Sequence, residues 1–161
     1  MTTNEKSKAY IKTPLGIAEI TGDENGISII SITDEGEISS EIPAVLQEAV
    51  AQLRDYFEAK RTDFTFKMNP QGTEFQQKVW QALLEIPFGK TCSYMDLSKK
   101  LGDVKAIRAV ASANGKNPLW IVVPCHRVIG TDGSLTGYAG GLWRKKWLLE
   151  HENPTNQQSL F

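Results

Sequence analysis

The chain has 161 residues, of which 40% are hydrophobic and 23% are charged, values typical of one globular domain or of two small ones that share a core. This composition excludes a disordered tail, a collagen-like fibre and a coiled coil. The longest apolar runs, such as residues 119–125, are too short to cross a bilayer, so we expect no transmembrane segment and no membrane partner. The N-terminus is polar and only two cysteines occur, Cys92 and Cys125, so we expect no secretory leader, no disulfide framework and a cytoplasmic location.

The net charge of −1 conceals an asymmetry between the two halves of the chain. Residues 1–72 contain 7 Lys/Arg and 12 Asp/Glu, a net charge of −5, whereas residues 73–161 contain 11 and 7, a net charge of +4. This difference favours a C-terminal part that meets a polyanion and an N-terminal part that stays clear of it. The alternative is an uninformative scatter of charges over a solvated surface.

The first 72 residues are predicted to form a small β-sheet with a helix. Residues 16–21 and 27–33 are rich in β-branched side chains and flank a turn at 23–26, which predicts a hairpin. Ser39 or Ser40 could cap a following helix with Pro43 in its first turn. Its core face recurs at helical spacing: Leu46, Ala49, Val50, Leu53, Tyr56 and Phe57. Residues 60–63 would end this helix, and residues 68–72 would form a linker.

Residues 73–153 are predicted to form a mostly helical domain, followed by a polar tail at 154–161. Thr73 is expected to cap a helix whose apolar face recurs with helical spacing from Phe75 to Ile86. Short helices at about 93–101 and 104–114 follow, joined by a turn at Gly102, and the second would end at Gly115. Two short helices with a tight glycine turn predict a helix-turn-helix, although an ordinary helical hairpin fits the same pattern. A last helix is expected at about 142–150.

The predicted helix at 104–114 divides into three faces at 100° per residue. The expected core face consists of Val104, Ile107, Val110 and Ala111. A basic face carries Lys105, Arg108 and Ser112, and a smooth face carries Ala106, Ala109 and Ala113. A smooth strip beside basic residues suits close approach to a phosphate backbone or groove. Tight packing of small residues against a neighbouring helix is the alternative.

The histidines and cysteines all lie in the C-terminal half, so a metal site has to be considered. The four potential zinc ligands are Cys92, Cys125, His126 and His151. Their spacing matches none of the usual zinc patterns, and adjacent residues do not easily chelate one ion, so we predict no metal. Neither a glycine-rich dinucleotide loop nor a P-loop occurs, and we predict no cofactor.

Cys125 beside His126 is a candidate nucleophile, because a nearby imidazole or positive charge raises the thiolate fraction of a thiol. Residues 119–123 are an apolar run that predicts a buried extended segment. In extended backbone adjacent side chains point to opposite faces, so His126 reaches the thiol only through a sharp turn or a water. Pro124 favours such a turn. The alternative is a buried structural cysteine that behaves as a small hydrophobe.

The sequence PCHRV at 124–128 resembles the active-site signature of the O6-alkylguanine-DNA alkyltransferases, also called methylated-DNA–protein-cysteine methyltransferases. Further motifs follow the family's order and spacing, namely Phe88-Gly89, Ser93-Tyr94, Arg108-Ala109-Val110, Asn117-Pro118, Tyr138 with Gly140-Gly141-Leu142, Trp147-Leu148-Leu149 and His151-Glu152. The resemblance covers residues 73–153. Residues 1–72 match only in outline the family's RNase H-like N-terminal domain, so the resemblance implies an α+β fold with a helix-turn-helix in its second domain.

The resemblance also implies a role for individual residues at the reacting centre. Cys125 would accept the alkyl group, His126 would act as a water-mediated base, and Glu152 would orient that histidine. Asn117 would brace the turn, and Tyr94 would donate a hydrogen bond to the guanine leaving group and crowd the DNA phosphate.

The remaining implied roles concern DNA and the flipped base. Arg108 would fill the gap left by the flipped nucleotide, and Lys105 and Lys116 would pair with phosphates. Tyr138 and its loop would close over the base. The base edge would be read by backbone groups at Cys125, Val128 and Ala139.

Three departures from the family pattern qualify this assignment. Ala139 stands where some relatives carry Ser, so a hydroxyl is lost and the backbone N–H remains. Residues 1–72 contain no Cys or His, so the zinc ligands of some relatives are absent. A branch that binds lesions without transfer has Trp at the acceptor position, whereas this chain has Cys125.

The implied activity is a single-turnover transfer of an alkyl group from O6-alkylguanine, or O4-alkylthymine, in DNA to Cys125. The implied partner is alkylated double-stranded DNA, bound through its minor groove largely without sequence preference, and the protein would act as a monomer. Two alternatives remain open, a Cys-His hydrolase and a helix-turn-helix regulator or lesion-binding module without chemistry.

Overall fold

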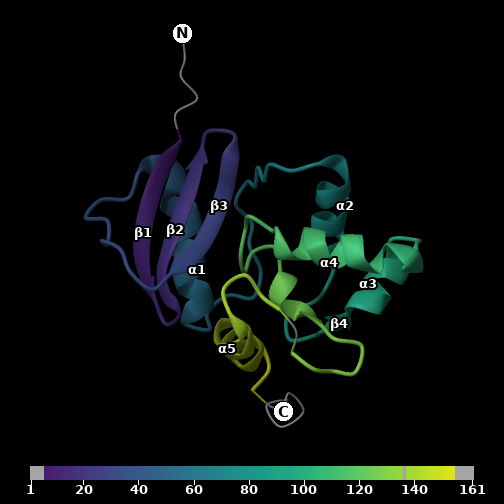
Figure 1. Ribbon diagram of the computed structural model, residues 1–161. Helices are drawn as coiled ribbons and strands as arrows, with labels where there is room; N and C mark the ends of the chain where they lie inside the picture. Colours follow the sequence, from purple (N-terminus) through teal and green to yellow (C-terminus); the bar gives the residue numbers. More distant parts are fainter. Residues whose placement is uncertain (1–5, 136, 155–161) are drawn as a thin grey trace. The chain divides into compact units, whose positions relative to one another are not determined.

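The computed structural model describes residues 6–135 and 137–154. The chain divides into two compact units, Met1–Gln71 and Gly72–Phe161 (Figure 1). Most of the tail predicted at 154–161 lies outside the described residues. Within the described part of the chain, no helix has both the length and the apolar character needed to cross a membrane.

The first unit contains a three-stranded antiparallel sheet in the order β1-β2-β3, formed by β1 (Ser7–Thr13), β2 (Gly16–Asp23) and β3 (Gly26–Thr33). The predicted hairpin is confirmed as β2 and β3, with a register shift between Thr21 and Gly22. Strand β1 was not predicted. Its buried residues alternate with the exposed Lys8 and Lys12 and the half-buried Tyr10, because its second face is largely solvated.

A helix covers one face of this sheet (Figure 1). It begins with the 3-10 turn η1 (Ala44–Leu46) and continues as α1 (Gln47–Phe57). The predicted cap at Ser39 or Ser40 is wrong, because the Ser39 hydroxyl accepts a hydrogen bond from the Tyr10 N–H at 2.9 Å and so holds its segment against β1. Helix α1 ends at Phe57, a few residues before the end predicted at 60–63, and Ala59 just after it adopts a left-handed backbone.

The second unit begins with α2 (Glu74–Leu83), and its predicted Thr73 cap is confirmed as a capping box with Gln76. Strand β4 (Cys92–Ser93) leads into α3 (Tyr94–Lys100), which the Ser93 hydroxyl caps by accepting from the Asp96 N–H at 3.0 Å. After a turn at Gly102, the chain continues through the 3-10 turn η2 (Val104–Ala106) into α4 (Ile107–Gly115). Helices α2, α3 and α4 pack on one another in the second unit.

Two details of α4 differ from the prediction. Its first turn is 3-10, and Gly115 is its last helical residue rather than the residue after the helix. Its buried face consists of Val110, Ala113 and Asn114, whereas Val104 is 46% exposed. The carbonyl of Ala113 accepts a hydrogen bond from the Trp80 indole at 2.9 Å, so this alanine belongs to the packed interior and not to a smooth outer strip.

The segment after α4 is buried, as predicted for residues 119–123, but it forms a turn instead of an extended run. The Val123 N–H donates to the Leu119 carbonyl at 3.0 Å, and Ile121 has a φ of 75°. The 3-10 turn η3 (Cys125–Arg127) follows, and then β5 (Val128–Ile129), which pairs in parallel with β4. The last helix, α5 (Leu142–Glu152), runs two residues beyond the predicted end and carries Glu152 in its final turn.

Candidate active site

Cys125 lies at the start of a tight turn, which brings the side chains that follow it into a small volume. The Arg127 N–H donates to the Pro124 carbonyl at 3.0 Å, and the Cys125 N–H donates to the Val123 carbonyl at 2.8 Å. The sharp turn predicted at this point is therefore present. Cys125 is only 5% exposed and His126 is fully buried.

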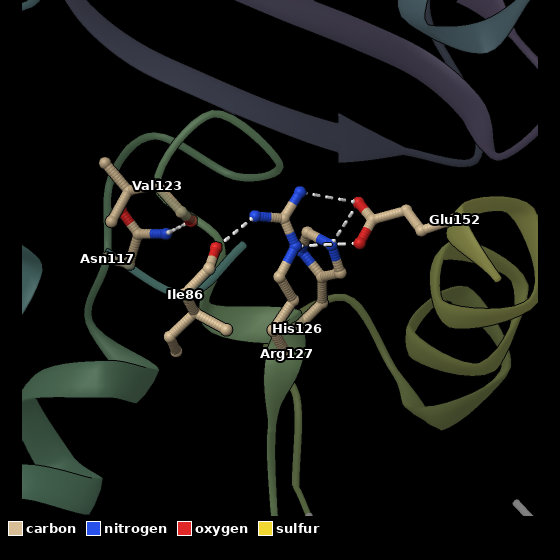
Figure 2. A network of polar contacts seen from close by, with 6 residues as sticks. All are labelled: Ile86, Asn117, Val123, His126, Arg127 and Glu152. Atoms are coloured by element: carbon tan, nitrogen blue, oxygen red, sulfur yellow. Dashed lines mark hydrogen bonds and ion pairs between the residues drawn. The ribbon is translucent and has the colours of Figure 1, made fainter. Parts of the chain in front are cut away.

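Asn117 holds the turn that precedes Cys125. Its side-chain N–H group donates to the Val123 carbonyl at 2.8 Å (Figure 2). The same group donates to the Leu119 carbonyl at 3.2 Å, and the amide oxygen accepts from the Leu119 N–H at 2.9 Å. A β-branched residue such as Ile121 adopts a left-handed backbone only where the surroundings enforce it. The three bonds of Asn117 supply that enforcement.

Glu152, the last residue of α5, connects this helix to the turn η3 through a buried network of hydrogen bonds (Figure 2). One carboxylate oxygen accepts from His126 Nε2 at 2.7 Å and from Arg127 Nη2 at 3.0 Å, and the other accepts from Arg127 Nε at 2.7 Å. Arg127 Nη1 donates to the Ile86 carbonyl at 2.8 Å, and the guanidinium lies 5.7 Å from the centre of the Phe88 ring. Arg127 thus binds the carboxylate in two places and fixes its orientation.

The network determines which nitrogen of His126 carries a proton. Burial alone would raise the pKa of the Glu152 carboxyl, but the charges and hydrogen bonds of His126 and Arg127 outweigh it and hold that pKa far below its usual range. An ionised carboxylate only accepts hydrogen bonds, so His126 Nε2 must carry a proton. In the neutral imidazole Nδ1 is then an acceptor, and within the described residues this buried atom has no hydrogen-bond partner.

The thiol of Cys125 is a neutral group at rest. Burial raises the pKa of Cys125 to about 11, although the Asn117 side chain and the charge of Lys145 act in the opposite direction. Lys145 is itself fully buried, and desolvation lowers its pKa to about 8. Adjacency to His126 therefore does not give a resting thiolate, and a base has to remove the proton during the reaction.

A cavity of about 390 Å³ opens beside the thiol. Its lining residues come from α3, α4, the turn before Cys125 and the segment after β5: Tyr94, Ala111, Asn114, Gly115, Asn117, Trp120, Cys125, Gly137, Tyr138 and Ala139. The volume is in the range of small-molecule sites. The structure thus brings the predicted Tyr94, Asn117, Cys125, Tyr138 and Ala139 together around one space.

Comparison with known proteins identifies the family. The model of the 6-O-methylguanine DNA methyltransferase DNA-binding domain matches residues 74–154, and the model of the ribonuclease-like domain of the same proteins matches residues 7–70. The chain belongs to this family. A methylated-DNA–protein-cysteine methyltransferase of Methanosarcina acetivorans is 44% identical over 151 residues, which cover 89% of this chain and 96% of the relative.

Solved structures of the same family share the fold. The crystal structure of Mycobacterium tuberculosis O6-methylguanine methyltransferase is 39% identical, covers 93% of this chain and 94% of its own, and has a TM-score of 0.83. Mycobacterium tuberculosis OGT in complex with DNA is 41% identical, covers 96% and 98% of the two chains, and has a TM-score of 0.82. The α+β class and the membership of the alkyltransferase family predicted from the sequence are confirmed.

Other residues predicted for the alkyltransferase site lie outside the cavity wall. Lys105, Arg108 and Lys116 are exposed on η2, on α4 and just after it, so they are available to a partner. Val128 is buried in β5 and is not among the residues that line the cavity. Among residues 6–135 and 137–154, no group of three or more His, Cys, Asp or Glu side chains is placed to hold a metal ion.

Several residues of the site were not predicted, among them Arg127, Lys145, Asn114 and Trp120. Arg127 stands inside the PCHRV signature, and its place directly after the candidate base was the available signal. Lys145 lies in a basic run that looks like an ordinary solvated helix face, and its burial had no signal in the sequence. Asn114 and Trp120 flank the Asn117-Pro118 motif, and nothing in their spacing indicates a cavity.

Proposed function

We propose that the protein repairs DNA by transferring the alkyl group of O6-alkylguanine to the sulfur of Cys125. The observation that carries this proposal is the position of the Cys125 thiol, in the wall of a base-sized cavity and next to a histidine whose tautomer is fixed by Glu152. The relatives' names describe the same chemistry, a methyl group moved from DNA to a protein cysteine.

The proposed reaction assigns each proton to a residue of this site. His126 Nδ1 would take the thiol proton through a bridging water, while Glu152 holds Nε2–H and keeps the ring oriented. The thiolate would attack the alkyl carbon, the carbon–oxygen bond would break, and Tyr94 would donate a proton to the departing guanine. The proton held by His126 would then return to the Tyr94 phenolate through solvent. In sum the alkyl group moves from oxygen to sulfur, and the departing guanine gains one proton in exchange for the one that the thiol loses.

The same proposal includes the way in which DNA reaches the site. The target carbon is hidden inside the base stack, so the nucleotide must be extruded. Arg108 would fill the gap and Lys105 and Lys116 would pair with phosphates in a minor-groove complex without sequence preference. Tyr138 would close over the base, and backbone groups at Cys125, Val128 and Ala139 would read its edge.

We also infer a division of labour along the chain. Residues 73–153 would carry both the chemistry and the DNA contacts, while residues 1–72 would take no part in either. The protein would act as a monomer. Because the acceptor thiol must stay reduced, a reducing compartment such as the cytoplasm suits it.

Intact-protein mass spectrometry tests the reaction. After incubation with a duplex that contains O6-methylguanine, the protein should gain the mass of one methyl group, and peptide digestion should locate it on Cys125. Cys125→Ser should abolish the gain, whereas Cys92→Ser, which leaves the acceptor in place, should not. A methyl group on Cys92, or repeated demethylation by one molecule, would contradict the proposal, and the second result would favour a hydrolase. The same measurement with a duplex that contains O4-methylthymine tests whether Cys125 also accepts a methyl group from thymine.

A further inference from the structure

Two asparagines line the cavity beside Cys125, and their side chains are used in opposite ways. Asn117 makes three hydrogen bonds to backbone groups of its own turn. Asn114 is just as deeply buried, with 3% of its surface exposed, yet its amide oxygen has no hydrogen-bond partner among residues 6–135 and 137–154. One amide is therefore committed to the fold and the other is not.

An amide in this position is unfavourable for the folded protein alone. Asparagine is a poor helix former, and Asn114 lies in the last turn of α4, on the face that also buries Val110 and Ala113. A buried carbonyl without a partner has lost its hydrogen bonds to water and regained none. An apolar residue of similar size would avoid this loss, so the fold does not explain the amide.

A second unpartnered polar group lines the same cavity. The hydroxyl of Tyr138, on the segment after β5, is buried and has no hydrogen-bond partner among the described residues. Two separate segments of the cavity wall thus each hold a buried polar atom that has no hydrogen-bond partner among the described residues. Buried polar atoms without a hydrogen-bond partner are typical of functional sites, at which a ligand supplies the missing hydrogen bonds.

We propose that the side-chain amide of Asn114 hydrogen-bonds the extruded O6-alkylguanine base, which makes Asn114 a base-recognition residue; this rests on the function proposed above. The edge of that base carries ring-nitrogen acceptors and an amino donor, and an amide offers both a donor and an acceptor. The terminal torsion of asparagine turns at little cost, so the amide can align with the base as it enters. The contact is made to the base and not to the duplex.

The test compares Asn114→Leu with the wild-type protein on two substrates, a duplex containing O6-methylguanine and the free modified base, with methylation of Cys125 as the readout. We expect the rate constant to fall about ten-fold with both substrates, because one hydrogen bond to the base is lost in each case. The thermal midpoint of Asn114→Leu should equal or exceed that of the wild type, since an unsatisfied buried amide is removed. Asn114→Ala, which cannot overfill the site, should give the same loss of rate.

Gln81→Leu is the matched control, because it removes an exposed amide from α2 in the same unit and should leave both rates unchanged. Unchanged rates in both Asn114 variants, a loss confined to the duplex, or a clear fall in the thermal midpoint of both variants would overturn the role in base recognition. Failure of the wild-type protein to acquire a methyl group on Cys125 would instead overturn the proposed function, and this inference with it.

Discussion

Glu152 keeps its charge in a place where burial alone would remove it. The carboxylate is compensated by Arg127 at two atoms and by His126 at one. Arg127 also bonds the Ile86 carbonyl, so the orientation of the carboxylate depends on the chain just after α2 as well as on the turn. The orientation of His126 depends on Glu152, and the orientation of Glu152 depends in turn on Arg127.

Acid should destabilise the protein through Glu152. Its pKa in the folded state lies below the ordinary value of 4.5, so the carboxylate contributes stability that is complete above that value and is lost as the pH falls further. Thermal midpoints measured from about pH 6 to pH 3 should therefore fall less steeply in Glu152→Gln than in the wild type. Parallel curves for the two proteins would show that the carboxylate is not compensated in solution.

Removal of Arg127 should cost more than a surface ion pair does. Arg127→Met leaves a buried carboxylate with only His126, and breaking such a pair destabilises by roughly 3–5 kcal/mol. Urea unfolding measures this difference, and Arg127→Lys should recover part of it because one charged hydrogen bond can re-form. A loss below about 1 kcal/mol, the value for exposed pairs, would contradict the burial seen here.

The thiol of Cys125 should respond to pH as a group that is protonated at neutrality. Because burial raises the pKa of Cys125 to about 11, its alkylation by iodoacetamide without DNA should still be accelerating at about pH 10. Mass spectrometry of the Cys92→Ser protein follows the one remaining thiol. Below about pH 8, where Lys145 still carries its charge, Lys145→Met should slow the reaction further, because the charge that favours the thiolate is gone. A rate that levels off near pH 8 would show a resting thiolate instead.

Among the elements, those with local signals were predictable from the sequence. Thr73 and Ser93 cap helices where their side chains and spacing indicate, because capping is decided within four residues. The start of α1 was not predictable, because Ser39 is used by strand β1, which lies far away in sequence. The turn at 119–123 was missed for a similar reason, since Asn117 bends an apolar run that otherwise suits extended backbone.

The candidate site was predictable to the extent that its chemistry lies in short motifs. Cys125, His126, Asn117 and Glu152 come from the family signature, and the structure gathers them. The burial of Arg127 and Lys145 could not be predicted, because charged residues in a basic stretch are usually solvated and only tertiary packing reveals the exceptions.

Helix α4 should affect reactions on duplex DNA more than reactions on the free base. Arg108 is exposed on this helix and does not line the cavity beside Cys125. Arg108→Ala should slow methyl transfer from the duplex, because the extruded state loses the side chain that fills its gap. Transfer from the free modified base should change little, since that base needs no extrusion. Equal losses on both substrates, measured by methylation of Cys125, would exclude this role.

At the scale of the whole molecule, the residues of the candidate site belong to one of the two units. The cavity lining and the Glu152 network all lie within Gly72–Phe161, the unit with the positive part of the charge asymmetry. The negative charge of residues 1–72 fits an N-terminal unit that stays away from a polyanion.

The reaction should lower the stability of the protein that performs it. A cavity opens on one side of the Cys125 thiol, but the cysteine is only 5% exposed, and we expect a methyl group on its sulfur to press against the Asn117 turn. Overfilling of that kind typically costs about 1–3 kcal/mol. For a chain of this size the melting temperature should fall by roughly 2–4 °C per kcal/mol. Thermal melts before and after reaction with one equivalent of methylated duplex measure the shift, and Cys125→Ser with the same duplex is the control. An unchanged or higher midpoint would show that the site has room for the product.

The depth at which Cys125 lies has a consequence for the lifetime of an unused molecule. A thioether has no carbonyl for water to attack, so a protein that keeps its alkyl group reacts only once. Every side reaction of the Cys125 sulfur therefore inactivates one whole protein molecule. Oxidants and small electrophiles react with exposed thiolates, and a neutral, buried thiol presents neither the charge nor the access that they require. The low reactivity of Cys125 in the absence of DNA thus protects the protein until it meets a lesion. A longer lifetime of the unmodified protein accompanies a less reactive free thiol.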